Sequence, residues 1–234
     1  MKTIFVTGTD TAVGKTVVSR ALLQCFAKAG LCAAGYKPVA KSAQHTPDGL
    51  RNKDALLLQQ ASGLELPYQA VNPITLEEDE ISTSASVRMD YPLLSRSLEQ
   101  LQSRAARVVV EGTGGWRSLM NDLQPLSSWV QQEQLPVVLV VGIKEGCISH
   151  ALLTADAIAR DGLPLAGWVA NRINPGLAHY AEIIDVLREK LGAPLLGELP
   201  YLPRAEQREL SGYLDISLLD DALMHDDSAQ LAAG

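Results

Sequence analysis

The 234-residue sequence contains only three cysteines, and their spacing excludes two common structural roles. Cys25, Cys32 and Cys147 form no C-x-x-C pair and belong to no pattern of metal ligands. Such spacing indicates neither a disulfide framework nor a zinc site. We therefore expect reduced, partly buried thiols.

Positive charge is also scarce. The chain has 20 Lys and Arg residues against 27 Asp and Glu residues, which gives a net charge of −7 and a pI near 5.1. A protein that binds nucleic-acid backbones generally needs a basic face that releases counterions. The charge balance argues against nucleic-acid binding, while a local anion site is still compatible with it.

Long apolar runs are missing as well. No stretch approaches the roughly 20 apolar residues of a membrane span. The apolar start of the chain, Ile4 to Val6, is too short for a signal peptide. We therefore expect a cytoplasmic protein that does not enter a membrane.

What the sequence does contain is the composition of an ordinary globular domain. Hydrophobic residues make up 47% and charged residues 20% of the chain, close to the globular average. A chain of this length fits one hydrophobic core. We expect a single domain over residues 1–224 and a flexible tail over residues 225–234.

Short β-branched runs alternate with helical patterns along the chain. Strands are predicted at 3–7, 108–111, 137–142, 165–171 and 195–199. Helices are predicted at 15–29, 53–63, 93–104, 126–133, 148–161 and 180–191. Apolar strands that alternate with helices are typical of a parallel sheet. The predicted class is doubly wound α/β, with a mainly parallel sheet flanked by helices.

Residues 72–90 break this alternation. The segment carries four consecutive acidic residues, 77–80, and then several serines, with little apolar periodicity. It is predicted to be a long surface loop. Loops of this length are often lids or binding loops, and a plain solvated insertion is the alternative.

The strongest motif follows the first predicted strand. Gly8 to Thr16 reads GTDTAVGKT and leads directly into a helix, which is the context of a phosphate-binding loop. Loop amides and the helix N-terminus would hold phosphates, Lys15 would reach the outer phosphates and Thr16 would ligate Mg²⁺. Five residues separate Gly8 and Gly14, rather than the usual four, so the motif is a variant. A simple glycine turn is the weaker alternative.

Three further charged side chains are predicted to meet this loop. Lys37 follows a second short strand, Asp54 starts a helix, and Glu111 ends the strand at 108–111 beside a glycine-rich turn. Carboxyl ends of parallel strands share one sheet edge, so these groups would lie near the loop. Lys37 can neutralise charge on a phosphoryl group or a carbamate, and the two carboxylates can bind metal. Taken alone, Lys37 could equally be a solvated lysine, and Asp54 a helix cap.

Two later segments are open to more than one interpretation. The helix start at Cys147 to His150 offers amide groups to a carboxylate, although Cys147 itself is better explained as a packed thiol. Asn171 suits an adenine edge, and the proline-bounded segment 200–203 could wall the base. Both are equally compatible with ordinary strand-to-loop connections.

Six ordered blocks of the sequence together resemble the dethiobiotin synthetase family along nearly the whole chain. They span residues 8–16, 35–40, 49–56, 111–116, 146–150 and 167–171. The five-residue spacing of the glycine loop is the one this family uses. Six blocks in order are far more specific than one loop.

The resemblance implies a phosphate-binding-loop NTPase fold and an ATP-dependent cyclo-ligase of biotin biosynthesis. 7,8-Diaminononanoate would take up CO2 as a carbamate, ATP would phosphorylate the carbamate to a carbamic-phosphoric anhydride, and the second amine would close the ureido ring, leaving ADP and phosphate. The implied cofactors are ATP and Mg²⁺. A homodimer is implied, with the helix start of one subunit holding the carboxylate of the other subunit's substrate.

The resemblance also assigns roles to individual positions. Catalytic roles fall on Lys37, Lys15 and Thr11. Metal ligation falls on Thr16, Asp54 and Glu111. Substrate contacts fall on Thr11, Lys37, Lys41, Cys147, Ile148 and Ser149. Nucleotide contacts fall on Asp10, Thr11, Ala12, Val13, Gly14, Lys15, Thr16, Val17, Glu111, Gly112, Asn171, Pro200, Tyr201 and Leu202.

Three positions depart from the family pattern. The family commonly has glutamate, serine and asparagine where this chain has Ala12, Lys41 and Ser149. A lost carboxylate and an added lysine change the local charge by two units, which predicts weaker attraction of a cationic diamine. A paralogue that uses the same ATP chemistry on another amine or carboxylate is therefore the first alternative.

A nucleotide-switched ATPase of the partitioning type is the second alternative. Such proteins usually carry a second, signature lysine early in the glycine-rich loop. Here that stretch is Thr9, Asp10 and Thr11, which argues against this class.

Overall fold

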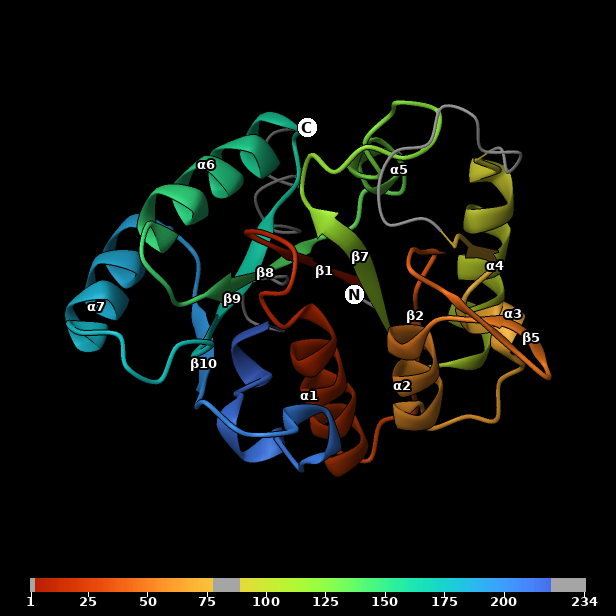
Figure 1. Cartoon of the computed structure of the whole chain (residues 1–234), viewed down its shortest axis with the longest axis horizontal. Helices are drawn as coiled ribbons and strands as arrows, with labels where there is room; N and C mark the ends of the chain where they lie inside the picture. Colours follow the sequence, from red (N-terminus) through yellow and green to blue (C-terminus); the bar gives the residue numbers. More distant parts are fainter. Residues whose placement is uncertain (1–2, 78–88, 220–234) are drawn as a thin grey trace, which may run out of the picture.

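The computed structural model describes residues 3–77 and 89–219, and these residues surround a parallel sheet (Figure 1). The strand order of this six-stranded sheet is β10-β9-β8-β1-β7-β2. In that order the strands are β10 (Leu195–Leu199), β9 (Leu165–Asn171), β8 (Val137–Gly142), β1 (Thr3–Gly8), β7 (Arg107–Gly115) and β2 (Ala33–Tyr36). Every pairing in this sheet is parallel. The predicted doubly wound class is confirmed.

Helices cover both faces of the sheet (Figure 1). Seven α-helices are described: α1 (Lys15–Lys28), α2 (Lys53–Ala61), α3 (Tyr68–Val71), α4 (Tyr91–Arg104), α5 (Ser127–Gln132), α6 (Cys147–Arg160) and α7 (Tyr180–Lys190). Two 3₁₀ turns follow β10, namely η1 (Ala205–Gln207) and η2 (Ser211–Tyr213). Among the described residues, no helix has both the length and the apolar character to cross a membrane.

Strand β8 shows why both faces need a cover. Its side chains alternate between two hydrophobic clusters, because successive residues of a strand point to opposite faces. Leu139 and Val141 pack in the cluster that contains the buried residues of α7 and of the first half of α6. Val138 and Val140 belong to the larger cluster, which contains the apolar side of α1. A strand without a polar face is stable only when it is covered on both sides.

The sheet order brings three loops together at one edge. Strand β1 lies between β7 and β8, and β2 lies beyond β7. The carboxyl ends of β1, β7 and β2 therefore adjoin one another, and each leads into a segment with polar residues. Ligands of doubly wound proteins bind outside the carboxyl ends of strands, where the strand order reverses.

Several small elements between β2 and α4 were not predicted. The pair β3 (Val39–Ala40) and β6 (Ile74–Thr75) is parallel, and β4 (Gln44–Thr46) with β5 (Gly49–Arg51) forms a hairpin. The prediction that residues 72–90 form a surface loop is wrong for its first part. Asn72, Ile74 and Leu76 are buried, because β6 pairs with β3. Residues 78–88 of that segment lie outside the described residues.

Element boundaries also differ from the predicted ones. Strand β7 does not end at Glu111 but continues to Gly115, so Glu111 lies within the strand. Helix α4 begins two residues earlier than predicted, where the Asp90 side chain accepts a hydrogen bond from the Leu93 amide and caps the helix. The predicted tail, residues 225–234, lies outside the described residues.

Candidate active site

The loop between β1 and α1 has the backbone geometry of a phosphate-binding loop. Ala12 has a φ of 57° and Gly14 a φ of 96°, so the chain turns through the left-handed region twice. A Cβ at Gly14 would lie 2.0 Å from Nδ2 of Asn171. Glycine is therefore required both by its φ and by the close approach of Asn171.

Asn171 fixes the loop from the end of β9. Its Nδ2 donates a 2.8 Å hydrogen bond to the Val13 carbonyl, and the side chain is buried. The Val13 side chain is fully buried in the hydrophobic core, so only its backbone can face a ligand. The loop is thus held from both sides before any nucleotide binds.

Lys15 opens helix α1 and is largely buried. Its Nζ donates a 3.1 Å hydrogen bond to the Asp10 carbonyl, across the loop. Burial, together with the positive charge of Lys37, lowers the pKa of Lys15 from its ordinary 10.5 to about 8. Because the buried ammonium group has lost much of its hydration, binding of an anion beside it is electrostatically favourable.

Asp10 links the loop to the segment that precedes α6. Its Oδ2 lies 2.7 Å from Nζ of Lys144, and its Oδ1 accepts a 2.7 Å hydrogen bond from the Thr11 amide. The hydrogen bond from Lys144 is the main reason that the pKa of Asp10 is lowered. Asp10 therefore acts within the loop and does not line the cleft described below.

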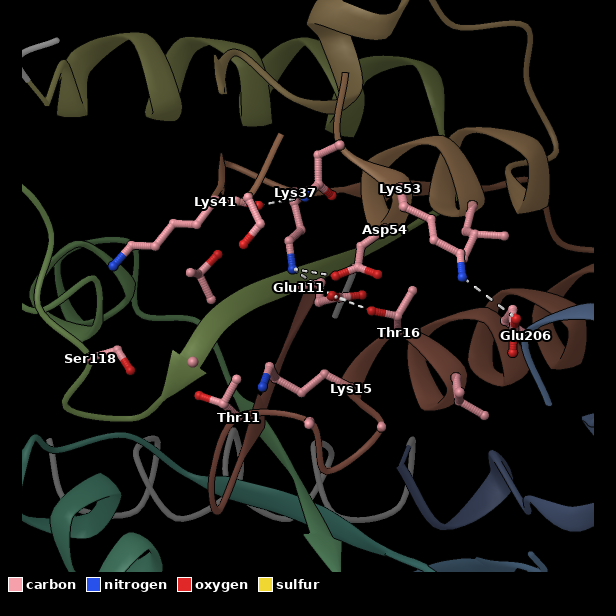
Figure 2. A pocket seen from close by; sticks show the side chains of 18 residues that line it. Thr11, Lys15, Thr16, Lys37, Lys41, Lys53, Asp54, Glu111, Ser118 and Glu206 are labelled. Carbon is pink, nitrogen blue, oxygen red and sulfur yellow. Dashed lines mark hydrogen bonds and ion pairs between the residues drawn. The ribbon is translucent and has the colours of Figure 1, made fainter. Parts of the chain in front are cut away.

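Glu111 lies at the centre of the charged groups (Figure 2). Its Oε1 accepts a 2.6 Å hydrogen bond from Nζ of Lys37 and a 2.8 Å hydrogen bond from the Thr16 hydroxyl. Lys37 also donates to the Gly112 carbonyl at 3.1 Å and lies 3.8 Å from Oδ2 of Asp54. Glu111 is fully buried, and its Oε2 has no hydrogen-bond partner among the described residues.

These groups line a cleft of about 760 Å³, which brings together ten of the predicted site residues. They are Thr11, Ala12, Gly14, Lys15, Thr16, Val17, Lys37, Lys41, Asp54 and Glu111. In Figure 2, Lys37, Asp54, Thr16 and Glu111 converge, whereas Lys41 extends away from them. The ammonium of Lys41 donates a 3.1 Å hydrogen bond to the Leu119 carbonyl.

The other predicted residues do not line this cleft. Within the described structure these are Asp10, Val13, Gly112, Cys147, Ile148, Ser149, Asn171, Pro200, Tyr201 and Leu202. Cys147 is buried against the core beneath α6, which agrees with the interpretation as a packed thiol. Ser149 and Tyr201 are exposed, and Leu202 packs partly against the core.

Some residues that line the cleft were not predicted as site residues. Thr113, Gly114 and Ser118 come from β7 and the turn after it. The glycine-rich turn after Glu111 was a visible signal for these positions. Glu206 is different, because it comes from η1, and no local pattern connects it to the loop. It lies 3.7 Å from Nζ of Lys53.

The oxygen atoms near Lys37 are candidate ligands for a metal ion. Thr16 contributes a hydroxyl, and Asp54 and Glu111 contribute carboxylates. Across the described residues, no group of three or more His, Cys, Asp or Glu side chains could hold a metal ion. One or two carboxylates together with phosphate oxygens are the usual ligand set of Mg²⁺.

Comparison with known proteins decides the family. A family model described as an AAA domain matches residues 2–209. ATP-dependent dethiobiotin synthetase BioD 2 from Salmonella typhi and the same protein from Escherichia coli K12 are each 68% identical over 226 residues, covering 97% of this chain and 98% of theirs. The chain belongs to the dethiobiotin synthetase family. The Yersinia pestis BioD 2 relative is 60% identical and covers 92% of this chain and 97% of its own.

Solved structures agree on the fold of this dethiobiotin synthetase family member. The cell-division protein MinD of Aquifex aeolicus is 14% identical with a TM-score of 0.53, and 97% of each chain is covered. A ParA family ATPase of Chlorobium tepidum is 12% identical with a TM-score of 0.52, covering 95% of this chain and 98% of its own. At such identities the likeness concerns the fold alone, which is that of a phosphate-binding-loop NTPase.

Proposed function

We propose that this protein is the ATP-dependent cyclo-ligase that closes the ureido ring of dethiobiotin on 7,8-diaminononanoate. The observation that carries the proposal is the Lys37–Glu111–Thr16 cluster beside a phosphate-binding loop. The cluster occurs in a chain that is 68% identical to dethiobiotin synthetases over nearly its full length. Ring closure needs an activated carbamate, and a cleft of this charge suits that chemistry.

The reaction balances in three steps. One amine attacks CO2 and loses a proton, which gives a carbamate. A carbamate oxygen attacks the γ-phosphorus of ATP, so that the bond to the bridging oxygen breaks and ADP leaves. The second amine attacks the carbonyl carbon of the mixed anhydride and loses a proton, and phosphate leaves as the ring closes.

Lys15 and Lys37 are proposed to offset the repulsion between two anions. A carbamate that approaches a triphosphate brings like charges together, and positioned cations stabilise the charge in the transition state. Nζ of Lys37 is held by Glu111 and the Gly112 carbonyl, so its position is set before substrate binds. Thr11 lines the same cleft and offers a hydroxyl to the carbamate or the diamine.

Mg²⁺ fits the oxygen atoms around Glu111. The buried Oε2 of Glu111 has no hydrogen-bond partner in the described part of the chain, and the Thr16 hydroxyl donates to Oε1 of the same carboxylate. We propose that Thr16, Asp54 and Glu111 hold the ion, directly or through water. When bound, it would supply positive charge for the phosphates. Lys37, at 3.8 Å from Asp54, keeps the two carboxylates from repelling each other in the free protein.

Asn171 favours adenine as the base. The Val13 carbonyl accepts one of the two Nδ2 hydrogens, and we propose that Oδ1 meets the base. A carbonyl oxygen can accept from the amino group of adenine but has nothing to accept from the carbonyl at the same position of guanine. We propose that Asn171 contacts adenine and that Pro200, Tyr201 and Leu202, just after β10, form a wall of the base site.

We propose a homodimer in which α6 completes the partner's substrate site. The first turn of α6, from Cys147 to Ser149, is proposed to hold the carboxylate through the amides of Ile148 and Ser149, since the Cys147 amide donates to the Lys144 carbonyl at 3.1 Å. Leu153, on the same helix, is a large apolar side chain that is 65% exposed. Burial of this side chain in a subunit interface would explain its exposure in the monomer.

We propose that the ligands of this protein are small molecules, namely the diamine and CO2. Neither nucleic acid nor a membrane is proposed as a partner. The relatives are synthetases of small molecules, which supports a place in the cytoplasm.

Phosphate release with the purified protein tests the proposal. ATP, Mg²⁺ and bicarbonate are supplied with and without 7,8-diaminononanoate, and dethiobiotin is followed by mass spectrometry. We expect equal amounts of phosphate and dethiobiotin, both dependent on the diamine. ATP binding without diamine-dependent turnover would reject this substrate and favour a paralogue that acts on another amine. The positive charge of Lys41 in the cleft would then explain why a cationic diamine is not used.

A further inference from the structure

Three buried polar residues form a continuous hydrogen-bonded bridge beside the cleft, and one of them, Asn52, lines it. They are Asn52, before α2, Tyr68, the first residue of α3, and Asn72, just after α3. Their exposed fractions are 6%, 6% and 1%. Buried polar groups are costly unless they are satisfied, so a fully paired network of this kind specifies one arrangement of the chain.

Asn72 holds the backbone of Lys37 at one end of the bridge. Its Nδ2 donates to the Lys37 carbonyl at 2.7 Å and to the Ile74 carbonyl at 3.0 Å. The Lys37 amide donates to the Val71 carbonyl at 2.7 Å. Both backbone polar groups of Lys37 are therefore fixed, one by the last residue of α3 and one by the residue after it, and the Cα of Lys37 is fixed with them.

The hydroxyl of Tyr68 connects the two asparagines. It donates to Oδ1 of Asn72 at 2.8 Å and accepts from the Asn52 amide at 2.8 Å. The guanidinium of Arg51 lies 4.3 Å from the centre of the Tyr68 ring, which fixes the ring as well. A hydroxyl used as donor and acceptor at once cannot move without breaking one of the two contacts.

Asn52 fixes the start of α2 at the other end. Its Oδ1 accepts from the Ala55 amide at 3.0 Å, which caps the helix, and its Nδ2 donates to the Lys41 carbonyl at 2.7 Å. Asp54 lies in the first turn of this helix. A shift of the cap would therefore move the Asp54 carboxylate, which lies 3.8 Å from Nζ of Lys37.

We infer that the Asn52–Tyr68–Asn72 bridge positions Lys37 and Asp54 relative to each other, with the Tyr68 hydroxyl as its central contact. Tyr68 is a positioning residue, because it does not line the cleft and acts through the two ends of the bridge. The inference rests on the proposed function only for the roles of Lys37 and Asp54. Residues that hydrogen-bond to catalytic groups, or to the backbone that carries them, commonly determine how well those groups are aligned.

Tyr68→Phe tests the inference, and Thr75→Val is its matched control. The Thr75 hydroxyl also donates to Oδ1 of Asn72 at 2.8 Å, but among the described residues no hydrogen bond connects it to Asn52. Each substitution removes one donor from the same oxygen, and only Tyr68→Phe breaks the connection to α2. Four quantities are compared: kcat, the KM for the diamine, the Mg²⁺ concentration for half-maximal rate, and amide hydrogen exchange at Ala55.

In Tyr68→Phe we expect kcat to fall about tenfold, since small displacements of catalytic groups cost that much or more. The half-saturating Mg²⁺ concentration should rise, the KM for the diamine should change little, and exchange at Ala55 should accelerate by about tenfold because its cap loosens. Thr75→Val should stay within about twofold of the unmodified protein in kcat and in exchange.

Two outcomes would overturn the inference. One is unchanged exchange at Ala55 in Tyr68→Phe, and the other is an equal loss of kcat in both variants. Hydrogen exchange needs no substrate, so it reports on the bridge even if the chain does not use 7,8-diaminononanoate. A protein without diamine-dependent turnover but with faster exchange at Ala55 would reject the proposed substrate and keep the bridge.

Discussion

Lys15 shows how one residue combines a functional charge with a cost in stability. The folded chain lowers its pKa from 10.5 to about 8, mainly through burial. The unfolded chain thus binds this proton more tightly, and stability rises with pH between about 8 and 10.5 as far as Lys15 contributes. Below pH 8 the charged form is present in both states, and its desolvation is a constant penalty.

Replacement of Lys15 by methionine should therefore affect activity and stability in opposite directions. We expect phosphate release to fall at least a hundredfold, because a contact to the outer phosphates is lost. The unfolding midpoint at pH 7 should stay the same or rise, since no desolvated ammonium is left. Steady-state kinetics and thermal unfolding measure the two effects, and a large fall in the midpoint would contradict this view of Lys15.

Ala12 tests the charge balance in the substrate half of the cleft. It lines the cleft with a φ of 57°, and the family commonly has glutamate there. Ala12→Glu should lower the KM for the diamine, because a carboxylate attracts a diammonium ion. The KM for ATP should rise slightly through repulsion of the phosphates. If the KM for the diamine does not change, the charge at this position is irrelevant to substrate choice.

The conformation of the loop between β1 and α1 depends on a glycine at position 14. Gly14 combines a left-handed φ with the contact to Asn171, whereas Gly30 has a φ of 75° and open space around its Cβ position. A side chain added at Gly30 would therefore introduce backbone strain alone, whereas a side chain added at Gly14 would introduce both backbone strain and a steric clash. Only the clash would displace Asn171 and the Val13 carbonyl that it binds.

Gly14→Ala and Gly30→Ala form a matched pair. Gly30→Ala should cost about 1 kcal/mol of unfolding free energy, which is typical of a forced left-handed residue. Gly14→Ala should cost clearly more and should also abolish ATP binding, as measured by calorimetry. Equal losses of stability with ATP binding retained in both variants would show that the Asn171 contact is not needed.

At the scale of the molecule, the cleft is basic while the chain is acidic. The net charge is −7, yet Lys15, Lys37, Lys41 and Lys53 all line the cleft. Glu111, Asp54 and Glu206 line it as well, and they pair with two of the lysines: Lys37 with Glu111 and Asp54, and Lys53 with Glu206. Positive charge in the cleft of a negative molecule attracts anions to the site.

The proposed dimer gives a prediction at the same scale. Leu153→Glu should weaken the dimer and raise the KM for the diamine, because the partner's α6 would no longer complete the site. Tyr213→Glu is the control, since Tyr213 is 42% exposed but lies in η2, away from α6. Sedimentation velocity measures the association. A monomeric unmodified protein that is fully active would exclude the shared site.

Much of the fold and part of the site could be predicted because their signals are local. The glycine loop, the apolar strands and the helices between them each depend on residues that are close in the sequence. Ten predicted residues meet in one cleft because parallel strands deliver their carboxyl ends to one edge. The burial of Asn72 was missed, because β3 and β6 are only two residues long and have no periodicity to detect.

The sequence by itself determined the doubly wound class, the phosphate-binding loop and the family, since repeated local patterns and ordered motifs specify them. Only the tertiary structure decided which partners these residues have. Thr16 meets Glu111 from 95 residues away, and Asn171 meets Val13 from 158 residues away. Such contacts depend on the order and twist of the strands, and a single side chain that forms a long-range hydrogen bond leaves no pattern along the chain.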